Sequence, residues 1–367
     1  MKKYGKDIVK LVLFLSLGVF FVWFSLKDLS AEQRSTILTN AKDVMHDNRW
    51  IYLIICMFIG FLSVVFRGLR SVLMIDPMGY KVSKTNSYHA AMIGYLANFV
   101  FPRLGEVLRC TVLQKYEKVP FQKSLGTVIT ERIIDVLFFG ILLLLAVVLD
   151  FNNLLQSLIE IKNLPKQGDG SLWETVMSGT GKYIIIGLLV VAIVLVCILR
   201  KKILKWSVYQ KIVKIIKGFR DGTISIKDFK KPFLSLWYSF RDGLLSIKKL
   251  KKPFLFVVYS LLIWVCYYLM FYICTFAFPF LTVLDAKMIL LASLICVVIG
   301  TVGVSITQGG LGIFPLFVAI VLQQYEVVYE NGISVGWVTW STETLMYIVL
   351  GLISILVISL KKGKKTA

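Results

Sequence analysis

The first residues with evident chemical potential lie in the stretch PRLGEVLR, between two apolar runs. It holds Arg103, Glu106 and Arg109 directly after Pro102. If a helix resumes at the proline, the spacing of three keeps the charges on roughly one side, and Glu106 and Arg109 can pair at i, i+3. The free N–H groups of that first turn, together with Arg103, then form a site for an anionic head group. The alternative is a short cytoplasmic loop with solvated charges.

A second charged group, in the sequence TERIIDVLF, begins a long apolar run. Glu131 and Asp135 share a helical face at i, i+4, and Arg132 reaches Asp135 at i, i+3. The apolar residues 136–149 follow, so a helix places Asp135 roughly 20 Å from its far end, where each charge costs about 2.5–3.5 kcal/mol. The acids need cationic partners, and the candidates are Arg67, Arg70, Arg103 and Arg109. A purely structural ion cluster and a transport role both fit this pattern.

The last apolar run contains one further acid. Glu343 lies among Ser341, Thr342 and Thr344 in the sequence WVTWSTETLMY. Consecutive hydroxyl and carboxyl side chains in a membrane helix are expected to face a cavity or the bundle interior. Glu343 is therefore a candidate for direct ligand contact, with a structural role as the alternative.

The sequence TQGGLGIFP interrupts another apolar run with Gln308, Gly309, Gly310 and Gly312. Glycines let backbone amides approach a ligand closely. Irregular backbone at membrane depth is tolerated only within protein or against water. We expect this loop to line a cavity, although a close contact between helices would also favour glycines.

These groups belong to a chain of 367 residues that is 57% hydrophobic. A soluble chain of this length would expose too much apolar surface, and apolar runs of about 20 residues cross a membrane as helices. We therefore expect an all-α, polytopic membrane helical bundle. The net charge of +21 fits Lys and Arg on the cytoplasmic side, so no nucleic-acid partner is predicted. Six scattered cysteines without a CxxC pair, with two histidines, predict neither a metal site nor a cofactor.

Six apolar runs are long enough for full spans. They cover residues 8–26, 50–66, 124–149, 183–199, 254–278 and 335–360. Two further regions, 87–114 and 288–323, contain Gly and Pro and predict re-entrant hairpins or pairs of short spans. Because they begin on opposite sides, they fit an inverted repeat, although no strong sequence repeat is visible. Both termini are basic and should be cytoplasmic.

We expect one integral membrane domain over residues 1–367. Within it the segment 200–252 holds 16 Lys and Arg residues against three Asp residues, so it should be cytoplasmic. Its apolar residues recur at helical spacing, which predicts amphipathic helices lying on the inner leaflet. Helices packed against the bundle are the alternative.

Taken together, Asn98, the sequences PRLGEVLR and ERIIDVL, and the late GGLG resemble the lysylphosphatidylglycerol synthase transmembrane-region family. This flippase-like membrane domain also occurs fused to an aminoacyl-transferase domain. The resemblance covers nearly the whole chain and implies a multi-spanning inner-membrane protein that moves lipids between leaflets. The matching positions are Asn98, Pro102, Arg103, Gly105, Glu106, Arg109, Glu131, Arg132, Asp135, Gly309, Gly310 and Gly312.

The chain departs from the family in two ways. The family's glycine loop usually opens with proline and closes with glutamate, where this sequence has Gln308 and Pro315. Either the lipid differs, or Glu343 replaces the missing glutamate. The sequence shows no transferase domain, so aminoacyl transfer to lipid is not expected.

The leading hypothesis is a lipid translocase without enzymatic activity, located in the plasma (inner) membrane. Its partner is a membrane lipid with an anionic or zwitterionic head group, whose phosphate suits the forked donors of arginine. The sequence has no GxxxxGK[ST] motif, so movement would be passive or coupled to protons through Glu131, Asp135 or Glu343. The alternatives are a scaffold or partner subunit with a structural charge cluster, and an intramembrane lipid-modifying enzyme, for which His89 is the candidate histidine.

Overall fold

The computed structural model describes residues 30–46, 48–99, 104–163, 238, 240–243, 245–306, 308–310 and 312–361, and gives only the backbone of Gln33, Ile306 and Gln308. The chain divides into two compact units, one formed by Met1–Leu158 with Trp237–Ala367 and the other by Ile159–Leu236. The helices that build the site belong to the first unit. The predicted spans 8–26 and 183–199, and the 200–252 segment as far as residue 237, lie outside the described residues. The single-domain organisation stays a prediction.

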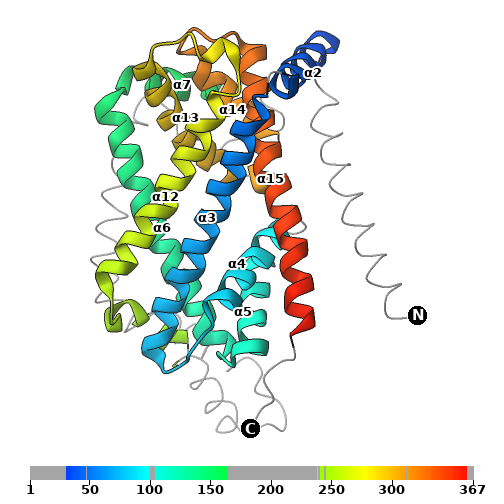
Figure 1. Cartoon of the computed structure of the whole chain (residues 1–367). Helices are drawn as coiled ribbons and strands as arrows, with labels where there is room; N and C mark the ends of the chain where they lie inside the picture. Colours follow the sequence, from blue (N-terminus) through cyan, green and yellow to red (C-terminus); the bar gives the residue numbers. More distant parts are fainter. Residues whose placement is uncertain are drawn as a thin grey trace, which may run out of the picture. The chain divides into compact units, whose positions relative to one another are not determined.

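All regular structure in the described residues is helical, which confirms the all-α membrane bundle (Figure 1). The α-helices are α2 (Ala31–His46), α3 (Trp50–Ile75), α4 (Lys84–Asn98), α5 (Leu104–Glu117), α6 (Phe121–Leu149), α7 (Phe151–Asn163), α12 (Pro253–Thr275), α13 (Ala286–Ile306), α14 (Ile313–Gln323) and α15 (Tyr329–Leu360). Short 3₁₀ turns lie at η1 (Asp76–Met78), η2 (Leu245–Lys249), η3 (Pro279–Leu281) and η4 (Gln308–Gly310).

Five of the described helices, α3, α6, α12, α13 and α15, are long and apolar enough to cross a membrane. They contain the predicted runs 50–66, 124–149 and 335–360, nearly all of 254–278, and the first part of 288–323. The total of six full spans stays a prediction. Helix α3 continues to Ile75, beyond the predicted end at residue 66, because Arg67 and Arg70 are buried and paired rather than solvated at a helix end.

The broken region 87–114 is a hairpin of α4 and α5. The Oδ1 atom of Asn98, the last residue of α4, accepts a hydrogen bond of 2.8 Å from the N–H of Gly105 in the first turn of α5. This bond satisfies one of the free donors that every helix start carries. The two helices also cross closely, since a Cβ placed on Gly105 would lie 2.0 Å from the carbonyl oxygen of Gly94. Glycine at position 105 is therefore required by packing.

The broken region 288–323 is a second hairpin, made by α13 and α14 with η4 between them. Gly309, Gly310 and Gly312 have φ angles of 66°, 79° and 73°, a left-handed conformation that glycine adopts without steric cost. Helix α14 has 11 residues, about 16 Å at the usual rise, so it is too short to cross the membrane.

The two hairpins meet at their tips. In Figure 1, α4 and α5 lie toward one end of α15, and α13 and α14 lie toward its other end. A Cβ placed on Gly309 would lie 3.0 Å from the Phe99 ring at the end of α4. The Trp340 indole of α15 donates a 2.7 Å hydrogen bond to the Gly309 carbonyl. The opposed arrangement expected from the sequence is present, while the inverted repeat itself stays a prediction.

Candidate functional site

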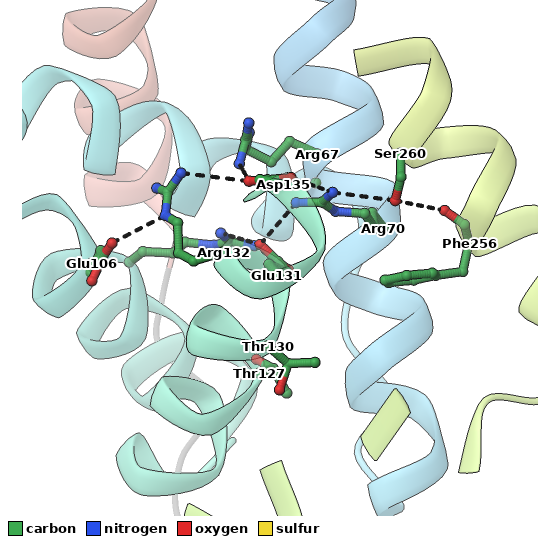
Figure 2. A network of polar contacts seen from close by, with 12 residues as sticks. Arg67, Arg70, Glu106, Thr127, Thr130, Glu131, Arg132, Asp135, Phe256 and Ser260 are labelled. Carbon is green, nitrogen blue, oxygen red and sulfur yellow. Dashed lines mark hydrogen bonds and ion pairs between the residues drawn. The ribbon is translucent and has the colours of Figure 1, made fainter. Parts of the chain in front are cut away.

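A network of buried ions joins α3 to α6 (Figure 2). The Asp135 carboxylate accepts hydrogen bonds of 2.8 Å from the Arg67 guanidinium and 2.7 Å from the Arg70 guanidinium. Arg70 also donates to the Ser260 hydroxyl of α12, at 3.2 Å. Asp135 therefore binds two arginines of α3. This confirms the prediction that an acid at this depth in α6 has cationic partners.

Glu131, one turn away on α6, is paired with Arg109 of α5. The two guanidinium nitrogens of Arg109 donate to the two carboxylate oxygens of Glu131 at 2.8 and 3.0 Å. Arg70 adds an ion pair of 3.8 Å to Glu131. Glu131 is 1% exposed and Arg109 is 5% exposed, so this pair is closed off from solvent.

The third acid, Glu106, pairs across helices with Arg132. The Arg132 Nε atom donates to Glu106 at 3.1 Å, and its Nη1 atom lies 3.6 Å from an Asp135 oxygen. The predicted pair of Glu106 and Arg109 within α5 is wrong, because Arg109 turns inward to α6 while Glu106 stays partly exposed. The Arg132 side chain is 46% exposed, which makes it the most accessible cation of this network.

A cavity of about 970 Å³ adjoins the network. Its walls come from α3, α4, α6, α12, α13, α14, η4 and α15. Arg67, Arg132 and Asp135 form its charged part, and Glu343 with Thr344 of α15 forms a separate polar part. This volume is in the range of pockets that hold small molecules or head groups.

Aromatic side chains connect the two polar parts of the cavity. Arg67 donates a 2.9 Å hydrogen bond to the Tyr267 hydroxyl, which lies 3.1 Å from the Tyr95 hydroxyl. The Tyr95 ring stacks on Tyr347 with 4.6 Å between centroids and an angle of 6°. The Tyr347 hydroxyl donates to Glu343 at 2.9 Å. All five side chains line the same cavity.

A family model described as Lysylphosphatidylglycerol synthase TM region matches residues 8–351 of the 367-residue chain. The chain belongs to this family. No curated protein and no solved structure gives a significant match. Membership agrees with the five long apolar helices and establishes an integral membrane protein whose family is the membrane region of a lipid synthase.

The described residues predicted for the site differ in how they lie relative to the cavity. Asn98, Arg132, Asp135, Gly309 and Glu343 line the cavity. Glu106 and Arg109 line only a much smaller neighbouring pocket of about 20 Å³, while Glu131, Gly310 and Gly312 line neither. Arg103 lies outside the described residues, as does the side chain of Gln308. Within the described part of the chain, no group of three or more His, Cys, Asp or Glu side chains is placed to hold a metal ion.

Glu343, the predicted substitute for the family's loop glutamate, lines the cavity. Pro315 occupies the sequence position of the family's loop glutamate. It is buried against α15, where a Cβ on Gly336 would lie 2.4 Å from the Pro315 Cα. Pro315 does not line the cavity, whereas Glu343 does. That Glu343 replaces the family's carboxylate stays a prediction.

Sequence reasoning missed part of the cavity wall. Arg67 was expected only as a partner for the acids, and Tyr95, Tyr267, Trp340 and Tyr347 were not singled out. Aromatic residues are common in apolar runs, so their type alone carried no signal. The spacing of four between Glu343 and Tyr347, which places both on one helix face, was a signal that could have identified Tyr347.

Proposed function

We propose that this protein moves a lipid with a phosphate-containing head group between the leaflets of the membrane. The observation that carries the proposal is the cavity, which combines one accessible guanidinium group, that of Arg132, with apolar walls. The described ion network holds four arginines and three carboxylates, and therefore one surplus positive charge. They are Arg67, Arg70, Arg109 and Arg132 with Glu106, Glu131 and Asp135. A phosphate near Arg132 would neutralise the surplus, and arginine suits phosphate geometry.

The depth of the cavity supports a role inside the bilayer. Asp135 and Glu343 each lie 14 positions from the ends of their helices at Leu149 and Tyr329. At 1.5 Å per residue, each lies about 21 Å from that end, well within a hydrocarbon layer about 30 Å thick. Keeping charges there is costly, and in a membrane such residues mark pathways for polar groups.

The cavity also has an apolar side that supports lateral access for a lipid. Val136 of α6 and Val302 and Val304 of α13 line it and are 57%, 39% and 42% exposed. In a membrane, exposed apolar side chains contact acyl chains. The head group would pass through the cavity while the tails stay in the bilayer.

We further propose that the protein is not an enzyme, that it lies in the plasma (inner) membrane, and that both termini are cytoplasmic. The excess of Lys and Arg near the termini and in residues 200–252 supports this orientation. Reporter fusions at residues 163 and 285 test it, because both positions should then be external.

The part of the ion network that does not line the large cavity supports a structural role for these residues alongside transport. Arg109, Glu131 and Arg70 link three helices and do not line the large cavity. Their loss should lower the abundance of folded protein. The loss of Arg132 should instead lower transport, because its side chain is half exposed in the cavity.

Lipid movement in proteoliposomes tests the proposal. We expect wild-type protein to move an acyl-labelled phospholipid faster than empty vesicles. Arg132→Ala should reduce the rate about tenfold or more, since hydrogen bonds to charged groups contribute about 1.5–3 kcal/mol. Arg132→Lys should keep part of the rate, because lysine retains the charge without the fork.

The matched control is Arg34→Ala, which removes an exposed arginine of α2 that does not line the cavity. It should behave like wild type. Equal rates for wild-type and empty vesicles would reject lipid transport. Wild-type rates for Arg132→Ala would reject this site for it.

A further inference from the structure

Glu343 is a cavity carboxylate without a protein counter-ion among the described residues. Its hydrogen bond comes from the neutral hydroxyl of Tyr347, at 2.9 Å. The other cavity carboxylate, Asp135, is bound by two arginines at 2.7 and 2.8 Å. An ionised carboxylate at this depth needs a cation, and the open side of Glu343 faces the cavity.

The surroundings of Glu343 suit an ammonium group. Tyr347 stacks on Tyr95 at 4.6 Å, and the Phe99 ring lies 6.0 Å from Tyr347. All three, and Trp340, line the cavity. Because Tyr95 and Tyr347 cover one face of each other, an ammonium group would contact the Phe99 and Trp340 rings instead. Aromatic rings attract quaternary and primary ammonium groups, and the Glu343 carboxylate adds charge complementarity. An ionised Glu343 would repel a phosphate.

The charged part of the cavity near Arg132 has the opposite preference. The ion network to which Arg67 and Arg132 belong carries one surplus positive charge, and Arg132 is accessible. One cavity therefore holds a positive part and a negative part, connected through Tyr95 and Tyr267.

We propose that this cavity selects a zwitterionic head group, in which a phosphate contacts Arg132 and Arg67 while an ammonium contacts Glu343. The inference rests on the proposed lipid transport and narrows its substrate to a phosphate ester of an amino alcohol. A membrane lipid and its soluble head-group ester share this chemistry. The exposed apolar wall at Val136 and Val302 favours the lipid.

Equilibrium binding to the purified full-length chain in detergent tests the inference without requiring transport. The probes are phosphatidylethanolamine, phosphatidylglycerol with the same acyl chains, and soluble glycerophosphoethanolamine. We expect wild type to bind phosphatidylethanolamine about tenfold more tightly than phosphatidylglycerol, the factor expected from one charged hydrogen bond. Glu343→Gln should abolish this preference while retaining phosphatidylglycerol binding, which also shows that the variant is folded.

Glu330→Gln is the matched control, because it removes a carboxylate of the same helix that does not line the cavity. It should keep the preference. A preference that survives in Glu343→Gln, or equal binding of the two lipids by wild type, overturns the inference. Binding of the soluble ester as tightly as the lipid overturns the assignment to a membrane lipid.

A transport measurement with lipids labelled on the acyl chain, which leaves the amine free, separates the two proposals. Selective binding without movement would reject the proposed function and keep the head-group assignment. Movement of both lipids at equal rates, with equal binding, would keep the function and reject the selectivity.

Discussion

The closed pair of Glu131 and Arg109 gives the sharpest stability prediction. We consider Glu131→Leu, Arg109→Met and the double variant, which replace charged side chains by apolar ones. Two hydrogen bonds of 2.8 and 3.0 Å join the native pair, and each partner is almost fully buried. Removing one partner leaves a buried charge without compensation, at a typical cost of about 3–5 kcal/mol.

The two single variants should lose different amounts of stability, because each leaves a different charged partner in place. In Arg109→Met, Glu131 keeps Arg70 at 3.8 Å, so the loss should lie near the lower value, about 3 kcal/mol. In Glu131→Leu, Arg109 loses the one carboxylate that its described ion pairs contain, so about 5 kcal/mol is expected. The double variant leaves no orphaned partner at position 109 or 131 and should be more stable than Glu131→Leu.

Thermal unfolding in one detergent, at fixed protein and lipid concentration, measures the order of stability. We expect wild type, then the double variant, then Arg109→Met, with Glu131→Leu lowest. Tyr238→Phe, which changes an exposed side chain, serves as a control for handling. A double variant that loses the sum of the two single losses would refute the reasoning, because independent sites add and a coupled pair does not.

Two glycine substitutions test the hairpins. Gly105→Ala should destabilise the protein by about 3 kcal/mol, the upper end for overpacking, because the new Cβ would meet the backbone oxygen of Gly94 at 2.0 Å; unchanged thermal unfolding would contradict the close crossing of α4 and α5. Gly310→Ala should lower the free energy of unfolding more than Gly79→Ala. Both glycines have positive φ, where a side chain costs about 1–2 kcal/mol. Only at Gly310 would the new Cβ also meet another residue closely, Val304 at 2.8 Å. Equal losses of stability in the two variants would show that the side chains around Gly310 can move to accommodate a Cβ without further cost.

Much of the fold could be predicted from the sequence, because apolar length and helical hydrogen bonding leave few choices in a membrane. The runs 124–149 and 335–360 became α6 and α15. The end of α3 was harder to place, because a hydropathy pattern treats Arg67 and Arg70 as a boundary. It cannot show that acids from a distant helix neutralise them.

The site was predictable in its components and less so in its pairings. The depth of Asp135 demanded arginines, and Arg67 and Arg70 supply them. Local spacing paired Glu106 with Arg109, but in the folded protein each finds a partner on α6, Arg109 with Glu131 and Glu106 with Arg132. Apart from Tyr347, the aromatic wall could not be predicted from the sequence, since Tyr267 acquires its role only from the neighbours that the fold supplies.

The ion pairs between α3 and α6 also impose an order on biosynthesis. Arg67 and Arg70 leave the ribosome before the carboxylates of Glu131 and Asp135 exist. Until then each arginine opposes insertion by about 2.5–3.5 kcal/mol at a helix centre. We therefore expect the C-terminal turns of α3 to stay at the membrane interface or within the insertion machinery until α6 is made. A nascent chain halted before α6 carries two arginines without the carboxylates with which they pair in the folded protein.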